Sequence, residues 1–236
     1  MGRKYGQVWI QLLLLCWLPL SWAGDDRGSG GSPRFAAIYN AAISHDQQAL
    51  EQLKQGGRLD EVDSQGRSVL LRVTHRKAYE AMRLLIGLGV DVDHYESGLA
   101  AGVIDPTPLL YAGAHGDTHA LGLLIAAGAR TDILNYYGGT ALIPAAEKGH
   151  VEAVRLLLEQ SDVDVNHVNR LGWTALMEVV LLSDGGPGHQ QILSLLLAHG
   201  ADAGITDFQG VTAMEHAQDR GLEALAQLLA AQANSN

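Results

Sequence analysis

Amphipathic, leucine-rich stretches recur along the chain at a nearly constant spacing. Each unit begins at a Ser or Thr and reaches a pair of Leu residues, 16 positions later in four of the five units. The starting residues are Ser68, Thr107, Thr140, Thr174 and Thr212, and the Leu pairs begin at positions 84, 123, 156, 195 and 228. A fixed period of this kind is typical of a repeat protein. The fourth unit has an offset of 21, so we interpret residues 184–188 as a five-residue insertion in the turn between two paired helices.

Each unit predicts two helices joined by a tight turn. In the second unit, Thr107 is placed to cap a helix that starts at Pro108, and Gly116 is placed to end that helix. Residues 119–129 predict a second amphipathic helix that ends at Gly128. A two-helix unit cannot bury its apolar face alone, so we expect the units to stack into an elongated all-α solenoid.

These units resemble the ankyrin repeat, closely at 138–160 and 172–204 and more loosely at 63–93 and 210–230. The resemblance covers residues 35–232 and implies an all-α ankyrin-repeat solenoid of paired antiparallel helices with hairpin-like loops. The expected divisions are a diverged cap at 35–62, five repeats at 63–95, 102–134, 135–168, 169–206 and 207–232, and a tail at 233–236. The family's Thr-Pro-Leu-His motif lacks its His in every unit, because Leu71, Leu110, Ile143, Met177 and Glu215 stand there. We therefore expect apolar packing where the family has a hydrogen-bond network.

The first 23 residues have the three-part pattern of a secretory signal peptide. Arg3 and Lys4 precede a nearly continuous apolar stretch at 8–20, and the sequence Ser-Trp-Ala predicts cleavage after Ala23. A membrane anchor is the alternative, but 13 apolar residues are fewer than the roughly 20 that span a bilayer. Cys16 is the only cysteine and lies in the segment to be removed; its lipidation is a further alternative that the preceding Leu15 disfavours. We expect a periplasmic protein, with residues 24–34 as a flexible lead-in.

The charge of the chain narrows the classes of partner that it can bind. The net charge is −10, and the first 23 residues hold two of the 16 basic residues and no acid, so the cleaved chain would carry −12. Nucleic acid and anionic membrane surfaces are disfavoured as partners, because binding them gains energy from cationic contacts. The resemblance implies a protein that binds another protein on a concave surface of hairpin tips and inner helices, without a cofactor. We expect it to be monomeric alone and not inserted in a membrane after cleavage.

Two other classes of function stay open. One is an immunity or inhibitor protein that neutralises a toxin or enzyme acting in the cell envelope. The other, an enzyme, has little support from motifs. The glycines at 185–188 are not followed by Lys-Ser or Lys-Thr, so they do not form a phosphate-binding loop. His115 and His119 have the spacing of a metal pair, but Gly116 falls in the turn between two helices and no third ligand is evident. We expect no catalysis and no metal.

The connection from Asp93 to Thr107 is the first candidate binding segment. It is 14 residues long, whereas three equivalent connections are 8. Long loops in compact proteins often carry function. We expect its apolar residues to contact a partner, the alternative being that the loop folds back and buries them; they are Tyr95, Leu99, Val103 and Ile104.

Large side chains at the other hairpin tips are further candidates, since aromatic residues are enriched at interface hot spots. They are Tyr136, Tyr137, Leu171, Trp173 and Phe208, with Tyr111 on an inner helix. Trp173 has an equal alternative, which is packing on a neighbouring helix.

Five basic residues of the first repeat lie within 17 positions, in spite of the acidic total. Arg72 and Arg76 would lie one turn apart on the inner helix and could bind carboxylates of a partner. The alternative is a solvated face, and we favour it for Lys77 and Arg83.

Overall fold

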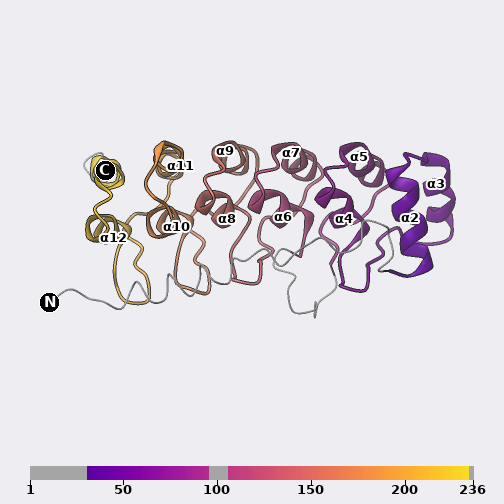
Figure 1. The fold of residues 1–236 in the computed structure, drawn as a ribbon, viewed down its shortest axis with the longest axis horizontal. Coiled ribbons are helices and arrows are strands. Elements are labelled where there is room, and N and C mark those ends of the chain that lie inside the picture. Colours follow the sequence, from indigo (N-terminus) through magenta and orange to yellow (C-terminus); the bar gives the residue numbers. More distant parts are fainter. Residues whose placement is uncertain (1–30, 96–105, 234–236) are drawn as a thin grey trace.

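The chain forms two rows of short helices that stack side by side along one axis (Figure 1). The computed structural model describes residues 31–95 and 106–233. Within these residues the helices are α2 (Pro33–Ile43), α3 (Gln47–Gln55), α4 (Val69–His75), α5 (Tyr79–Gly87), α6 (Pro108–Ala114), α7 (Thr118–Ala126), α8 (Leu142–Glu147), α9 (Val151–Gln160), α10 (Ala175–Leu182), α11 (Pro187–Ala198), α12 (Ala213–Asp219) and α13 (Glu223–Ala233). We call α4, α6, α8, α10 and α12 the inner helices and α5, α7, α9, α11 and α13 the outer helices.

The helices α2 and α3 lie within or beside the residues predicted as a cap, and they pack on each other at one end of the stack. Ser32 caps α2 by accepting a hydrogen bond from the backbone N–H of Phe35. Pro33 and Arg34 therefore belong to this helix and not to the lead-in, where the sequence had placed them. No helix among the described residues is both long enough and apolar enough to cross a bilayer.

Tight hairpin turns precede four of the inner helices and share one construction. An Asp or Asn side chain accepts hydrogen bonds from the backbone N–H groups two and four residues later, and the Gly between them has a positive φ, which favours glycine. The side chains are Asp63, Asn135, Asn169 and Asp207. No continuous strand forms in the described ranges, only isolated bridges.

The expected helix caps form in four repeats. The hydroxyls of Ser68, Thr107, Thr174 and Thr212 each accept a hydrogen bond from the backbone N–H three residues later. Leu71, Leu110, Ile143 and Met177 are buried, as the missing His predicted. Glu215 is the exception, because it is exposed and completes a capping box with Thr212.

The third repeat starts its inner helix late. In the other repeats the carbonyl of the capping residue accepts from the N–H four residues on, but Pro144 has no N–H. The N–H of Ile143 donates instead to the carbonyl of Thr140, at 3.3 Å, in a tighter turn. As a result α8 begins only at Leu142, and the buried Thr140 hydroxyl has no hydrogen-bond partner among the described residues.

The insertion in the fourth repeat is not confined to the turn. The turn between α10 and α11 holds residues 183–186, one more than the three-residue turns of the other repeats. Pro187 occupies the first position of α11, where a missing N–H costs nothing, and α11 has 12 residues against 9 in α5 and α7. The prediction that all of residues 184–188 lie in the turn is therefore wrong, since Pro187 and Gly188 lengthen the outer helix.

Candidate partner-binding surface

The inner helices and the hairpins form one continuous side of the molecule, which we call the hairpin face (Figure 1). In three repeats the side chain nine residues after the hairpin Asp or Asn lies on the inner helix and contacts that same Asp or Asn. An oxygen of Asp63 lies 2.9 Å from Nη1 of Arg72, Nδ2 of Asn169 donates to Glu178 at 2.7 Å, and Asp207 lies 2.8 Å from Nε2 of His216. These contacts, which we call hairpin ties, join three of the four hairpins to the inner helix that follows; the third repeat has Pro144 in this place.

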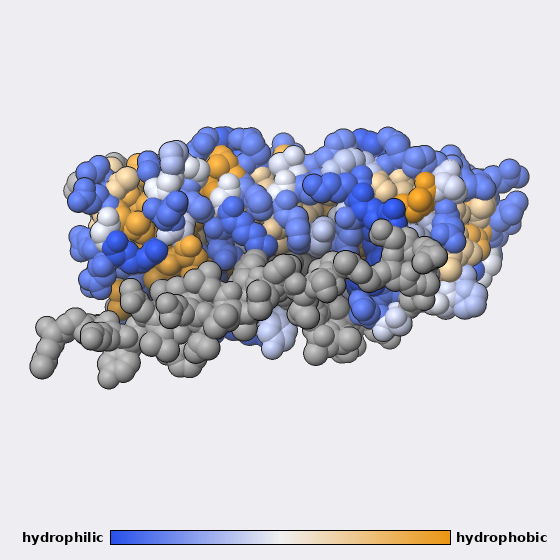
Figure 2. All heavy atoms as spheres, in the orientation of Figure 1, coloured by the Kyte–Doolittle hydropathy of each residue, from blue (hydrophilic) through white to orange (hydrophobic). Residues whose placement is uncertain are grey.

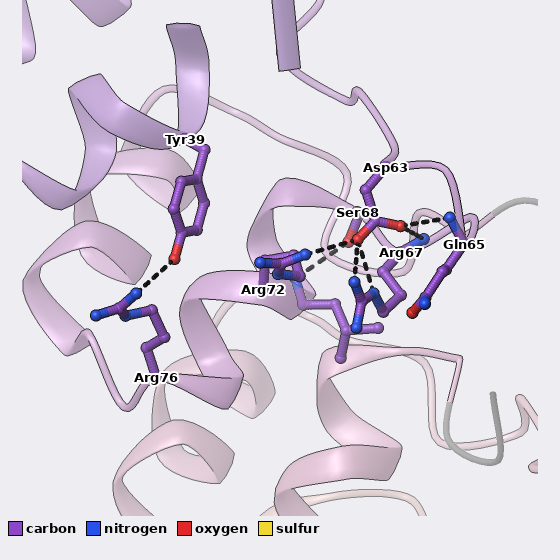
Figure 3. A network of polar contacts seen from close by, with 8 residues as sticks. Tyr39, Asp63, Gln65, Arg67, Ser68, Arg72 and Arg76 are labelled. Carbon is purple, nitrogen blue, oxygen red and sulfur yellow. Dashed lines mark hydrogen bonds and ion pairs between the residues drawn. The ribbon is translucent and has the colours of Figure 1, made fainter. Parts of the chain in front are cut away.

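The tie in the first repeat is a buried ion-pair network (Figure 3). The Asp63 carboxylate contacts Nη2 of Arg67 at 2.6 Å and Nη1 of Arg72 at 2.9 Å. Burial favours a higher pKa for Asp63, but the hydrogen bonds from Arg67, Gln65 and Arg72 hold its pKa below the ordinary value. The carboxylate is therefore ionised and neutralised from within the protein.

This network gives Arg72 a structural role that the sequence did not predict. Its residue exposure is 8%, it pairs with Asp63, and its guanidinium lies 5.6 Å from the centre of the Tyr39 ring. A partner that binds this guanidinium would compete with these contacts, and the role of Arg72 as a partner contact stays a prediction. Arg76 does lie one turn further along and is exposed, with Nη1 donating to the Tyr39 hydroxyl at 3.3 Å. Its role as a partner contact stays a prediction.

Three aromatic rings lie against one another where the first and second repeats meet, with His115 stacked on Tyr111 and His75 tilted against it. The Tyr111 ring lies 3.9 Å, centre to centre, from both His75 and His115. Burial, together with the cations Arg67 and Arg72, lowers the pKa of His75 to about 3, so this imidazole is neutral. Tyr111 is thus half-buried between two rings and offers only part of its surface to a partner.

His115 and His119 belong to different contacts, as the turn at Gly116 predicted. His115 stacks on Tyr111, whereas His119 stacks on Tyr79 at 4.2 Å. The φ of Gly116 is 62°, which places it in the turn between α6 and α7. Across residues 31–95 and 106–233 there is no group of three His, Cys, Asp or Glu side chains that could hold a metal ion.

The hairpins carry the exposed large apolar side chains of the described residues. Their exposures are 72% for Phe208, 65% for Tyr136, 42% for Val168, 40% for Leu134 and 38% for Tyr95. Val168 and Leu134 were missed from the sequence, although each directly precedes a hairpin Asn, which marks it as part of a tip. Figure 2 shows that apolar side chains otherwise form separate patches among polar ones, one of them beside α10 and α12.

The remaining predicted contacts are less accessible. Tyr137 and Leu171 are half-buried, and Tyr137 packs edge-on against Tyr136 with ring centres 5.3 Å apart. Trp173 is half-buried and packs against the core, as its alternative interpretation stated. Leu99, Val103 and Ile104 lie outside the described residues.

Neighbouring hairpins contact one another. Nη1 of Arg170 donates to the carbonyl of Tyr136 at 2.7 Å, and a Cβ at Gly138 would meet the Arg170 side chain. The Phe208 ring lies against Gly172 in the same way, because a Cβ there would lie 3.0 Å from the ring. The tips of the third, fourth and fifth repeats therefore hold Tyr136 and Phe208 along one edge.

A buried carboxyl group, Glu178, and a half-buried one, Glu147, interact electrostatically where α8 packs on α10. Burial and the neighbouring Glu147 raise the pKa of Glu178 to about 8, and burial raises the pKa of Glu147 to about 7. Such pKa values occur at catalytic sites. Glu178 is only 5% exposed, however, so burial in the helix packing accounts for most of its raised pKa, and the hydrogen bond from Asn169 acts in the opposite direction.

The architecture defines a helical repeat protein in which two-helix units are joined by hairpin turns. The chain belongs to the ankyrin-repeat family. Residues 94–169 match the family described as ankyrin repeats (3 copies), and residues 171–208 match the ankyrin repeat. The ankyrin repeat protein YahD of Escherichia coli (strain K12) is 34% identical over 179 residues, which cover 76% of this chain and 86% of YahD.

Solved structures and shorter relatives agree with this assignment. The crystal structure of an ankyrin repeat domain from Acinetobacter baumannii AYE is 39% identical, with a TM-score of 0.74, and covers 83% of this chain and 97% of that domain. The cyclin-dependent kinase 4 inhibitor B of Bos taurus is 40% identical over 80 residues, which cover 34% of this chain and 56% of the inhibitor. Ankyrin repeats are protein–protein interaction modules, and the fold is generally a non-catalytic scaffold.

Proposed function

We propose that this protein binds another protein in the bacterial periplasm, through the hairpin tips of its third to fifth repeats. The observation that carries the proposal is the exposure of Tyr136 and Phe208, at 65% and 72%. Both lie on a row of hairpins in which each hairpin contacts the next. Large aromatic side chains held on a rigid edge lose little conformational entropy on binding, and they are enriched among residues that dominate interface energies.

Site-specific photo-crosslinking in cells tests the position of the interface. A photoreactive phenylalanine analogue replaces Tyr136 or Phe208 in the full chain, and a matched variant carries it at Glu159 on the outer helix α9. We expect a discrete adduct from each hairpin position and none from position 159. Equal adducts from all three positions, or none from any, would contradict the proposed interface.

The compartment has its own test. The N-terminal pattern supports export, so the protein from the periplasmic fraction should begin at Gly24. N-terminal sequencing of the fractionated protein measures this directly. A chain that retains Met1 and stays in the cytosolic fraction would rule out the periplasmic part of the proposal.

An inhibitory role is the second candidate, in which the bound protein is a toxin or enzyme of the envelope. It is favoured by the similarity of one third of the chain to a protein whose name describes a kinase inhibitor. A rigid face of this kind can occlude another protein's active site without chemistry of its own. Co-expression with the cross-linked partner separates the two roles, because an inhibitor abolishes that partner's activity or toxicity, whereas a scaffold leaves it intact.

A further inference from the structure

Basic residues gather where the first three inner helices end. Arg76, His115 and Lys148 are the C-terminal caps of α4, α6 and α8, and Lys77 and His150 follow within two residues. We call these five residues the basic cluster. Of the three inner helices that end here, α4 and α6 contain no acidic residue and α8 contains one, Glu147, although the whole chain has a net charge of −10.

Part of this arrangement is structural. Cations at a helix C-terminus interact favourably with the helix dipole. Nζ of Lys148 donates to the carbonyl of Ala114 in the preceding inner helix at 3.0 Å, which satisfies an end of that helix. The His150 ring packs on Gly116, because a Cβ there would lie 2.6 Å from its Nδ1. These contacts bring the residues of three repeats together. Two acids adjoin them: Asp117 caps α7, and Glu147 directly precedes Lys148, where burial raises the pKa of Glu147 to about 7 and Lys148 acts in the opposite direction.

The lowered pKa values of the two histidines in the basic cluster reflect the positive charges around them. The pKa of His115 is lowered by burial and further by Lys148, His150 and Lys77, while its bond to the Tyr111 carbonyl acts in the opposite direction. The pKa of His150 is lowered by burial and by Lys148, against the bond to the Ala114 backbone. His75, the other histidine against Tyr111, is held neutral. An anion at this place would therefore meet several cations.

We propose that the basic cluster docks a carboxylate-rich segment of the partner protein and that docking is coupled to proton uptake by His115 and His150. This inference rests on the proposed function and adds the chemistry of a second contact region, beside the apolar hairpin tips. An acidic protein segment fits better than nucleic acid, because the net charge of −10 repels a long polyanion, whereas a short segment meets mainly the local cations.

The direction of the pH dependence follows from linkage. A bound carboxylate favours the charged imidazolium, so it raises the pKa of both histidines relative to the free protein. Between the free and bound pKa values docking takes up protons, and the affinity rises as pH falls. Each linked proton contributes at most about tenfold in affinity per pH unit.

A short fluorescent peptide of alternating Glu and Ser is the probe, and its anisotropy with the full chain measures binding at low salt. We expect Lys77→Glu to weaken binding about three- to tenfold, since it replaces attraction by repulsion at an exposed site. Lys54→Glu is the matched control, because it makes the same charge change on the outer helix of the cap. Equal effects of the two variants, at unchanged thermal stability, would overturn the proposal.

The double variant His115→Gln/His150→Gln tests the proton coupling. It should bind the peptide like the original protein at about pH 8 but lose the gain in affinity between about pH 8 and pH 6. Nuclear magnetic resonance of the imidazoles should show both pKa values rising when the peptide is added. A flat pH profile in the original protein would overturn the coupling, and equal binding of a thymidine oligonucleotide would overturn the choice of an acidic protein segment. If adducts at Tyr136 and Phe208 persist while Lys77→Glu has no effect, this inference fails and the proposed function stands.

Discussion

In the first repeat Asp63 binds Arg67 and Arg72, whereas in the fourth repeat Asn169 takes the same place in the hairpin and binds Glu178. In both repeats one side-chain oxygen of the hairpin residue accepts hydrogen bonds from the backbone N–H groups two and four residues later. The other polar atom is left to bind the inner helix, and its chemistry matches the residue found there. The fold thus sets the position of the contact between hairpin and inner helix, and the two side chains at that position set its charge.

The two ties differ in what they contribute. The first joins a carboxylate to two guanidinium groups, which hold the pKa of Asp63 below its ordinary value. The fourth buries an acid with a pKa of about 8 beside a second acid. The first therefore stabilises the ionised form of Asp63, whereas the fourth stabilises the fold best while Glu178 is protonated.

Asp63→Asn should have the largest effect, because it gives the first repeat the hairpin residue of the fourth. Asn keeps the turn, as Asn135 and Asn169 show, but leaves the guanidinium groups of Arg67 and Arg72 without their carboxylate. Removing one partner of a buried ion pair costs about 3 kcal/mol in the free energy of unfolding. Urea denaturation near neutral pH measures the loss. Asp132→Asn is the control, since Asp132 pairs with Arg130 in solvent, and an equal loss in both variants would show that the buried network is no stronger than a surface pair.

Glu178→Gln should have a smaller effect of the opposite sign. The unfolded acid ionises above a pKa near 4.5, but the folded one ionises only near 8, so the native state loses stability progressively as pH rises between these values. At about pH 8 the variant should be more stable by about 2 kcal/mol, less than the full linkage value because the amide must also be buried. At about pH 4.5 the gain should vanish.

Urea denaturation at both pH values measures this difference. Glu159→Gln on the outer helix α9 is the matched control and should change stability little at either pH. A Glu178→Gln variant that is equally stabilised at the two pH values would show that packing, rather than ionisation, sets the cost of this tie.

Sequence spacing was sufficient for the repeat architecture, because caps, turn glycines and Leu pairs are local signals. It placed Tyr136 and Phe208 on exposed tips for the same reason. It did not predict the ion pair of Arg72 with Asp63, since helical register does not reveal that a hairpin residue nine positions earlier contacts the same side chain. Sequence spacing also misplaced part of the insertion. Pro187 can begin a helix, so the extra residues lengthen α11 instead of staying in the turn. The basic cluster comes from residues of different repeats, which only the stacking brings together.

The third repeat allows the smallest and most local test of these contacts, because it has neither the ion pair of the first repeat nor the Asn–Glu hydrogen bond of the fourth. Pro144 stands nine residues after Asn135, and the Thr140 hydroxyl is buried without a hydrogen-bond partner in the described part of the chain. Thr174→Val removes a cap from Met177 and should cost about 1 kcal/mol, whereas Thr140→Val should be neutral or slightly stabilising. Thermal or urea unfolding of the two variants measures the difference. Equal losses would mean that the Thr140 hydroxyl does bind a partner in solution and that Pro144 has not displaced the cap.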